Sequence, residues 1–245
     1  MVDGQLNKTG VIIQARMGSS RLPGKVLMPF PFGTGTPLLE LIVKKIGRIF
    51  DSEQIYVATS AHQRDDAIAT LCSHLNINCF RGSEDDVLSR FTAIAEKHPE
   101  WNHIMRFTAD NPLISIPELR LFLGEFFVSD KQYCYTNGLP LGMNFEIVHK
   151  DLLLSLKKET LKESDREHVT SFIRNSLPNK CMKFSFDIKA TLRCTIDYPE
   201  DFLVLSAIQT VIEHNNDRSD LEVVLEHYEK NKWLFSINEN LKQLS

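Results

Sequence analysis

No stretch of this sequence is apolar for long enough to cross a membrane. Its longest apolar runs are short, whereas a membrane-spanning helix needs roughly 18–20 apolar residues. Residues 1–10 are polar and contain no apolar core of an export signal. We therefore expect a cytoplasmic protein with no membrane partner.

Signatures of several enzyme classes are also missing. There is no HExxH zinc motif, no Gly-x-Ser-x-Gly nucleophile elbow and no GxxxxGK[ST] phosphate loop. The five cysteines are odd in number and form no CxxC pair, which is typical of reduced thiols and not of a disulfide or zinc framework. The net charge of −4 is too small to indicate nucleic acid as the main partner.

Acidic residues are absent from residues 4–39, although the chain as a whole is acidic. The same stretch contains the basic residues Lys8, Arg16, Arg21 and Lys25. A locally positive segment in an acidic protein predicts a small anion as ligand.

What the sequence does contain is a regular alternation of strand and helix patterns. Up to residue 128 the order is β-α-β-α-β-α-β-α, which predicts an α/β fold with a mostly parallel sheet covered by helices on both faces. Strands are expected at 11–13, 54–59, 78–80 and 103–107, and helices at 37–50, 63–75, 85–97 and 117–128.

The rhythm changes after residue 130. Short strands are expected at 132–135, 145–148 and 181–186, and helices at 151–158, 165–177, 199–213 and 220–228. No repeat, low-complexity tract or linker divides the chain, so we predict one domain over residues 1–245. We expect residues 131–148 to form a small inserted arm that serves a partner subunit, and residues 238–245 to fray.

The positive segment includes a turn-rich loop directly after the first strand, which we call the basic loop (residues 14–25). In an open α/β sheet, ligands bind at the carboxyl ends of the strands. Gly18 would let backbone amides approach an anion, and Ser19 and Ser20 would add hydroxyl donors. Arg21 and Lys25 would bring fixed positive charge. The alternative is a flexible basic surface loop.

Residues 15–25, ARMGSSRLPGK, resemble the signature of cytidylyltransferases that activate sugar acids, the relatives of CMP-sialate and CMP-Kdo synthetases. The resemblance is greatest to the branch of spore coat polysaccharide biosynthesis cytidylyltransferases. Four further segments match that branch in order, at residues 82–91, 106–114, 165–170 and 193–201. The resemblance implies a three-layer, Rossmann-like nucleotidyltransferase fold, a homodimer, and transfer of CMP from CTP to a sugar acid with release of pyrophosphate.

Two aspartates in these segments are implied to bind a metal. Asp110 follows the fourth strand and Asp197 follows a strand-like segment, so both carboxylates are expected near the basic loop. Mg²⁺ usually takes one or two carboxylates together with phosphate oxygens. The alternatives are that Asp110 is a turn former before Asn111 and that Asp197 caps the helix that starts at Pro199.

The resemblance also implies the remaining roles. Catalysis would rest on Arg21, Lys25 and Asp110. The nucleotide would contact Gln14, Ala15, Arg16, Gly18, Ser19, Ser20, Arg21, Lys25 and Arg106. The sugar acid would contact Glu146, Arg166 and His168, with surface charge as the alternative for Arg166 and His168.

Two observations qualify these assignments. Ser164 and Glu167 have the spacing of a capping box, which would explain Glu167 without any function. Asn144 stands where the branch has an aspartate, and an amide supplies neither negative charge nor a proton acceptor of the same kind. The alternatives left open are another nucleotide, a phosphorylated acceptor, or a nucleotide-binding subunit without catalytic activity.

Overall fold

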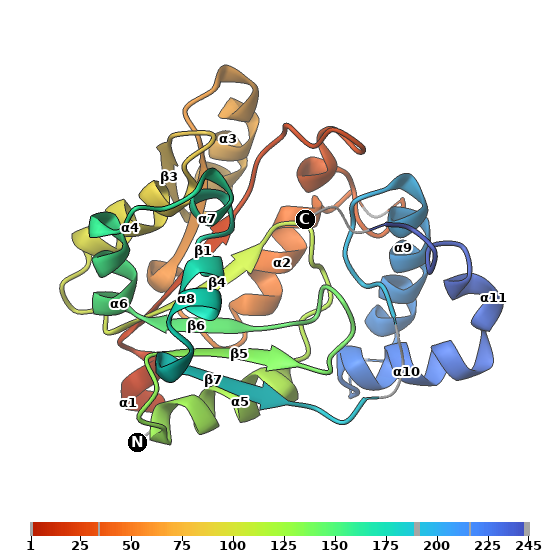
Figure 1. The fold of residues 1–245 in the computed structure, drawn as a ribbon. Coiled ribbons are helices and arrows are strands. Elements are labelled where there is room, and N and C mark those ends of the chain that lie inside the picture. Colours follow the sequence, from red (N-terminus) through yellow and green to blue (C-terminus); the bar gives the residue numbers. More distant parts are fainter. Residues whose placement is uncertain (1, 34, 189–191, 216, 243–245) are drawn as a thin grey trace.

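Seven strands form one sheet in the computed structural model, which describes residues 2–33, 35–188, 192–215 and 217–242 (Figure 1). The spatial order is β3-β2-β1-β4-β6-β5-β7. Only β6 runs against its neighbours among these strands, so the predicted mostly parallel sheet is confirmed. The bounds are β1 (Thr9–Gln14), β2 (Ile55–Ser60), β3 (Asn78–Gly82), β4 (His103–Thr108), β5 (Tyr133–Asn137), β6 (Glu146–His149) and β7 (Cys181–Ser185).

The central strand β1 is apolar on both faces because helices cover both sides of the sheet. Val11 and Ile13 belong to one hydrophobic cluster and Ile12 belongs to the other, and all three are fully buried. Alternate side chains of a strand point to opposite faces. The continuous apolar run therefore supplies both cores at once.

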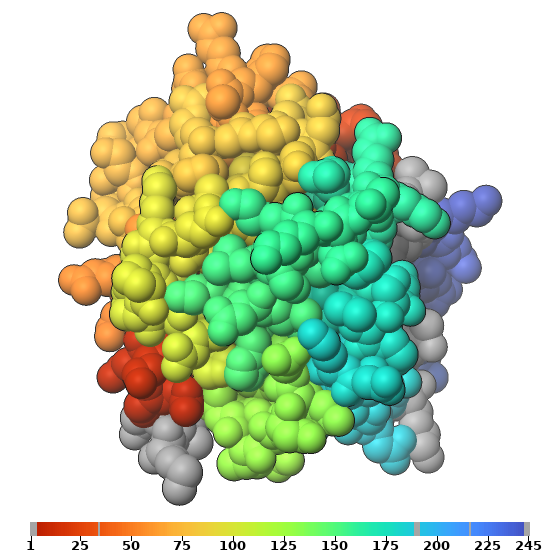
Figure 2. All heavy atoms as spheres, turned by 60° about the vertical axis from the view of Figure 1, so that its left-hand side comes forward, coloured from red at the N-terminus to blue at the C-terminus, as the bar shows by residue number. Residues whose placement is uncertain are grey.

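Helices form the two outer layers (Figure 1). One layer contains α2 (Leu38–Ile46), α3 (Asp66–His74), α5 (Ile116–Val128), α9 (Pro199–Glu213), α10 (Asp220–Lys230) and α11 (Lys232–Phe235). The other contains α4 (Val87–Lys97), α6 (Lys150–Ser155), α7 (Glu163–His168) and α8 (Ser171–Ser176). Figure 2 shows this second face, where residues 150–180, in green to teal, lie against residues 75–100 in yellow.

Shorter helical segments complete the fold. The helix α1 (Val2–Leu6) precedes β1. Single 3₁₀ turns occur at Lys25–Leu27, Ser52–Gln54, Gln63–Asp65, Leu156–Lys158 and Pro178–Lys180. None of the helices in the described part of the chain has both the length and the apolar character needed to span a bilayer.

The predicted inserted arm at residues 131–148 needs correction. Its two strands, β5 and β6, are interior members of the sheet, because β6 pairs with β4 and β5 pairs with β7. The turn between them, residues 138–145, is closed by Gly142 at φ 93°, where a Cβ atom would lie 2.6 Å from the Cys194 carbonyl carbon. The segment therefore belongs to the body of the domain, and its contact with a second subunit stays a prediction.

The helix predicted at 165–177 is broken into α7 and α8. The break is at Val169, which has φ 58° and a buried side chain. A left-handed backbone is unfavourable for a β-branched residue, so the surrounding contacts must hold it there. The predicted Ser164–Glu167 capping box is also wrong, because the amide of Lys162 donates to Asp165 at 3.3 Å and Ser164 lies inside the helix.

The start of the predicted frayed tail is firmly held. Asn238 is buried, and its side-chain amide donates to the Arg193 carbonyl at 3.2 Å and to Asp201 at 2.9 Å. An amide can satisfy both partners at once, which explains why a polar residue near the end of the chain is ordered. Residues 243–245 lie outside the described part of the chain.

Candidate active site

The basic loop and Asp110 meet at the carboxyl edge of the sheet. β1 and β4 are parallel neighbours, and Gln14 is in register with Thr108. Both strands therefore deliver the residues that follow them to one place. A cavity of about 320 Å³ opens there, lined by every predicted residue of the basic loop together with Asp110, Asp197 and His168.

The first turn of the basic loop is fixed by a buried carboxylate from elsewhere in the chain. Asp65 accepts a hydrogen bond from the amide of Met17 at 2.8 Å and is also bonded to the amide and hydroxyl of Ser60. Its side chain is fully buried. Although burial by itself would raise the pKa of Asp65, these hydrogen bonds outweigh it and lower the pKa below the usual value.

The last turn of the loop delivers Lys25 into an arrangement of carboxylates. Gly24 has φ 73°, a conformation natural to glycine, and its amide bonds back to the Met17 carbonyl at 3.0 Å. The ammonium nitrogen of Lys25 then lies 3.0 Å from a carboxylate oxygen of Asp110 and 3.0 Å from one of Asp197. It also donates to the Ile196 carbonyl at 2.5 Å.

Asp197 is held in place from behind by Arg193. The Arg193 guanidinium lies 2.9 Å from Asp197 and donates two hydrogen bonds to Asp201. Burial alone would raise the pKa of Asp197, but Lys25, and after it Arg21 and Arg193, lower the pKa below the usual value. Asp197 is thus an anion aimed at the cavity.

The alternative role of Asp197 as a helix cap is wrong. Asp201 accepts the hydrogen bonds from the amides of Asp197 and Tyr198, and Tyr198 is the N-cap of α9. The alternative role of Asp110 as a turn former is compatible with its place in the cavity. Residues 109–110 form a turn, and the Asp110 carboxylate accepts from both Lys25 and the Thr108 hydroxyl.

Arg21 lines the same cavity and lies over an aromatic ring. Its guanidinium carbon is 4.5 Å from the centre of the Tyr198 ring, a cation–π distance. One terminal nitrogen of Arg21 is buried and has no hydrogen-bond partner among the described residues. This donor is unused within the described part of the chain, and Arg21 lines the cavity.

The residues at the start of the basic loop make contacts to other elements. Gln14 accepts a hydrogen bond from Arg106 at 3.1 Å, which links β1 to β4. Arg16 lies 3.4 Å from Glu167 of α7, both of them half-exposed. Glu167 is therefore engaged across the mouth of the cavity by a contact that its sequence spacing did not suggest.

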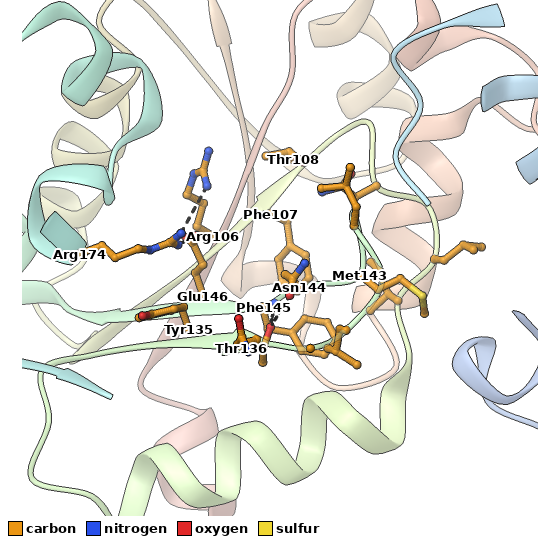
Figure 3. Close-up of a pocket in the computed structure, with 18 residues that line it drawn as sticks. Arg106, Phe107, Thr108, Tyr135, Thr136, Met143, Asn144, Phe145, Glu146 and Arg174 are labelled. Carbon is orange, nitrogen blue, oxygen red and sulfur yellow. Dashed lines mark hydrogen bonds and ion pairs between the residues drawn. The ribbon is translucent and has the colours of Figure 1, made fainter. Parts of the chain in front are cut away.

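A second cavity, of about 460 Å³, lies on the other side of β4 (Figure 3). Thr108 lines both cavities. The wall of the second cavity comes mainly from β5, β6 and the turn between them. Its charged residues are Arg106, Glu146 and Arg174, and its polar residues are Thr108, Asn111, Tyr135, Thr136, Asn137 and Asn144.

Glu146 is the centre of this charged group. It is bonded to Arg174, lies 3.4 Å from Arg106, and accepts a hydrogen bond from Thr170 at 2.6 Å. Burial by itself would raise its pKa, but the two arginines and Thr170 lower the pKa below the usual value. Two guanidinium groups against one carboxylate leave this cavity with a net positive charge.

The structure does not bring every predicted acceptor residue to this cavity. Arg166 is half-exposed and pairs with Asp86 at 2.8 Å, so it lines neither cavity. His168 lines the smaller cavity and not the larger one, whereas Arg106, which was expected at the nucleotide, lines only the larger one. Asn144 lies in the wall of the larger cavity, where its side chain is bonded to Thr136 and to the Pro140 carbonyl.

Sequence reasoning missed three residues of the site: Asp65, Arg90 and Arg174. Arg90 lies inside the matched segment 82–91, so the signal was present. Asp65 and Arg174 lie outside all five matched segments and reach the site only through the tertiary fold.

The chain matches the family model described as Cytidylyltransferase over residues 10–230. It belongs to the cytidylyltransferase family. Members transfer a nucleotidyl group from CTP, so this cytidylyltransferase is a CTP-dependent nucleotidyltransferase. The family predicted from the sequence motifs is confirmed.

Two curated relatives cover nearly the whole cytidylyltransferase. An uncharacterized protein, MJ1063 of Methanocaldococcus jannaschii, is 33% identical over 96% of both chains. The spore coat polysaccharide biosynthesis protein SpsF of Bacillus subtilis is 32% identical over 89% of this chain and 93% of its own. A solved cytidylyltransferase from Leptospira borgpetersenii has a TM-score of 0.83 and 26% identity, covering 97% of this chain and 99% of that one.

Proposed function

We propose that this cytidylyltransferase transfers CMP from CTP to a hydroxyl of a sugar acid and releases pyrophosphate. The observation that carries the proposal is the junction of the two cavities. Thr108 lines both, and its hydroxyl donates to Asp110 at 2.6 Å. A nucleotide in one cavity and an acceptor in the other would meet beside that carboxylate.

The smaller cavity has the charge pattern that a triphosphate needs. Arg21 and Lys25 would hold the phosphates, and their fixed charge would stabilise pyrophosphate as it leaves. The unpartnered nitrogen of Arg21 is a donor that a phosphate oxygen would satisfy. The acceptor hydroxyl would attack the α-phosphorus, so positioning and charge stabilisation supply most of the catalysis.

Asp110 and Asp197 fit a divalent cation. Both place a carboxylate oxygen 3.0 Å from one point, the Lys25 ammonium, so their oxygens already converge on a positive charge. Two carboxylates plus phosphate oxygens are the donor set that Mg²⁺ prefers. These two residues would hold Mg²⁺, which would supply positive charge to the triphosphate.

The larger cavity suits an acceptor that carries a carboxylate. Arg106 and Arg174 exceed Glu146 in charge, and guanidinium groups bind carboxylates in a bidentate way. Polar groups from the β5–β6 turn would meet the hydroxyls of a sugar. The name of the relative SpsF associates it with polysaccharide biosynthesis, and an activated sugar acid would be a precursor for such a polymer.

The direct test is pyrophosphate release with Mg²⁺, measured for the four nucleoside triphosphates against a panel of eight- and nine-carbon sugar acids. We expect release with CTP and one acid. Release with another nucleotide, or only with a phosphorylated acceptor, would contradict the proposal. Binding of CTP without release across the panel would favour a subunit without catalytic activity, and Asn144→Asp would then test whether the missing carboxylate is the reason.

Two arginines of similar exposure provide a matched pair for the acceptor site. Arg174 lines the larger cavity and Arg166 lines neither cavity, and their side chains are 41% and 44% exposed. We expect Arg174→Met to raise KM for the acceptor at least tenfold, with the affinity for CTP unchanged. Arg166→Met is the control and should leave both quantities within about twofold. A large effect there would instead indicate that the acceptor binds at α7, which contains Arg166.

A further inference from the structure

Arg90 is a buried arginine with unused hydrogen-bond donors at the wall of the smaller cavity. It lies in the first turn of α4 and is 2% exposed. One guanidinium nitrogen donates to the Ala58 carbonyl at 3.0 Å, while Nε is buried without a partner among the described residues. Apart from the bond to Ala58, no side chain or backbone group in the described chain satisfies this guanidinium.

The guanidinium is held firmly in one place. Its stem packs on Gly82, where a Cβ atom would lie 2.9 Å from Cγ of Arg90. The Ala58 carbonyl that it contacts also accepts the amide of Ala15 at 3.2 Å, which fixes the start of the basic loop. These contacts fix the Arg90 guanidinium against the backbone of β2 and the end of β3.

An arginine in this setting is unfavourable until a ligand arrives. Burial, followed by the nearby charge of Arg16, lowers the pKa of Arg90 to about 10. Buried donors without partners are rare in folded proteins because each loses its hydrogen bond to water. A ligand with hydrogen-bond acceptors at this wall would compensate for that loss.

The topology separates Arg90 from the phosphate-binding end of the cavity. Asp110 and Lys25 lie on the β4 side of β1, whereas Arg90 is bonded to Ala58 of β2, on the other side of β1. The cavity therefore extends across the end of β1 between these two points. A nucleoside triphosphate with its phosphates at Lys25 would place its base near Arg90, beside the apolar side chain of Val87.

We propose that Arg90 reads the pyrimidine ring of the nucleotide and selects cytosine over uracil. A guanidinium presents donors only. Cytosine offers two adjacent acceptors, O2 and N3, which match a pair of donors. Uracil carries a proton on N3, so a donor would face a donor and one hydrogen bond would be lost. This inference rests on the proposed function for its ligand, a nucleoside triphosphate.

The test is calorimetric binding of CTP and UTP to the whole protein, because binding does not depend on finding the acceptor. We expect wild type to prefer CTP by tenfold or more. Arg90→Met should weaken CTP at least tenfold and change UTP less than threefold, so that the preference collapses. Arg90→Lys should recover only part of it, because an ammonium group lacks the two-donor face. Lys97→Met, at the far end of the same helix, is the control and should bind both as wild type does.

A second measurement uses only the wild-type protein, so it does not depend on whether a variant folds. A CTP analogue with carbon in place of N3 keeps the shape of the base and loses one acceptor. It should bind wild type weaker than CTP by a factor similar to the loss on Arg90→Met. Equal binding of the analogue and CTP would overturn the inference.

Other outcomes have distinct meanings. Equal weakening of CTP and UTP in Arg90→Met would place Arg90 on the phosphates or ribose and overturn base reading. Unchanged binding with lower thermal stability would make Arg90 a purely structural residue, which also overturns it. Base-selective binding that depends on Arg90, without transfer to any sugar acid, would uphold the inference while the proposed reaction fails. Absence of nucleotide binding would overturn both.

Discussion

Lys25 and Lys45 are two equally buried lysines whose carboxylate partners differ in their exposure to solvent. Each connects the first fifth of the chain to a carboxylate near its end, Lys25 to Asp197 and Lys45 to Asp220. The carboxylates around Lys25 are 28% and 18% exposed and face a cavity. Asp220 is only 6% exposed, and the cavity that it lines with Lys45 is smaller, at about 170 Å³.

Both ammonium groups have three hydrogen-bond acceptors, so the two sites differ in how exposed their carboxylates are and not in how many partners the lysine has. Lys45 donates to the Pro112 carbonyl, to Gln209 and to Asp220, at 3.0, 2.9 and 2.6 Å. Burial lowers its pKa despite the nearby Asp220. A buried lysine among carboxylates is therefore not by itself the sign of an active site. The carboxylates must also be exposed enough to bind a ligand.

The largest effect is expected from breaking the Lys45–Asp220 ion pair. Lys45→Met should lower the free energy of unfolding by about 3–5 kcal/mol, because it leaves Asp220 buried without its cation. Urea unfolding measures this. Adding Asp220→Asn should recover much of the loss, since an amide oxygen still accepts from the Ile114 amide. If Lys45→Met were stable but inactive, the contrast between the two lysines would be broken.

Breaking the contacts of Lys25 with Asp110 and Asp197 should affect turnover instead of stability. Lys25→Met should lower kcat by about 10²–10³-fold, the usual effect of removing one electrostatic stabiliser. The thermal midpoint should move by only a few degrees, because water in the cavity and Arg193 still solvate and pair the aspartates. Pyrophosphate release and a melting curve on the same sample give both quantities. Near-normal turnover in folded protein would remove Lys25 from the mechanism.

His103 extends the comparison to a buried group that titrates. It begins β4, at the edge of the sheet opposite the cavities, and burial with the nearby His149 lowers its pKa from 6.5 to about 4. Between these values the unfolded chain binds a proton that the folded chain refuses. The stability that His103 provides is therefore complete above pH 6.5 and is lost as pH falls towards 4, by up to about 3 kcal/mol.

His103→Phe should remove this loss, because phenylalanine keeps a ring against Phe126 and does not titrate. Urea midpoints measured from pH 7 to pH 4 should fall less steeply in the variant than in wild type. His74→Gln, at an exposed position of α3, is the control and should follow the wild-type curve. Parallel curves for His103→Phe and wild type would mean that His103 does not control acid stability.

The smallest effect tests how the Tyr198 ring positions Arg21. Tyr198→Leu removes the ring beneath Arg21, and a cation–π contact contributes about 0.5–2 kcal/mol. The value of kcat/KM for CTP should therefore fall about 2- to 30-fold. Tyr198→Phe keeps the ring and should stay within about twofold. An equal loss in both variants would transfer the effect to the phenol hydroxyl, which donates to the Lys242 carbonyl.

Much of the fold was predictable because its elements have strong local patterns. Apolar runs and helical periodicity gave the strands and helices up to residue 128 and the parallel sheet. The arm at 131–148 was predicted wrongly because period-2 strands do not reveal their partners, and β6 enters the sheet between β4 and β5. The break at Val169 could not be predicted either, because a positive φ is unfavourable for a β-branched residue.

The site divides in the same way. Lys25, Asp110 and Asp197 were found because each follows a recognisable strand or loop motif, and the structure brings them together. The matched motifs indicate Arg166, whereas the structure places Arg174 at the larger cavity. The two lie on successive short helices, and only the turn at Val169 decides which of them reaches the cavity.

The shared wall at Thr108 has an evolutionary consequence. The smaller cavity draws on the basic loop and α4, whereas the larger one draws on β5, β6 and their connecting turn. Mutations accumulated in residues 135–145 would spare Glu146, which is linked to the basic loop through Arg106 and Gln14. If the nucleotide and the acceptor bind as proposed, a lineage with this architecture would change its acceptor without changing its nucleotide site, and Thr108 would mark the boundary between the two.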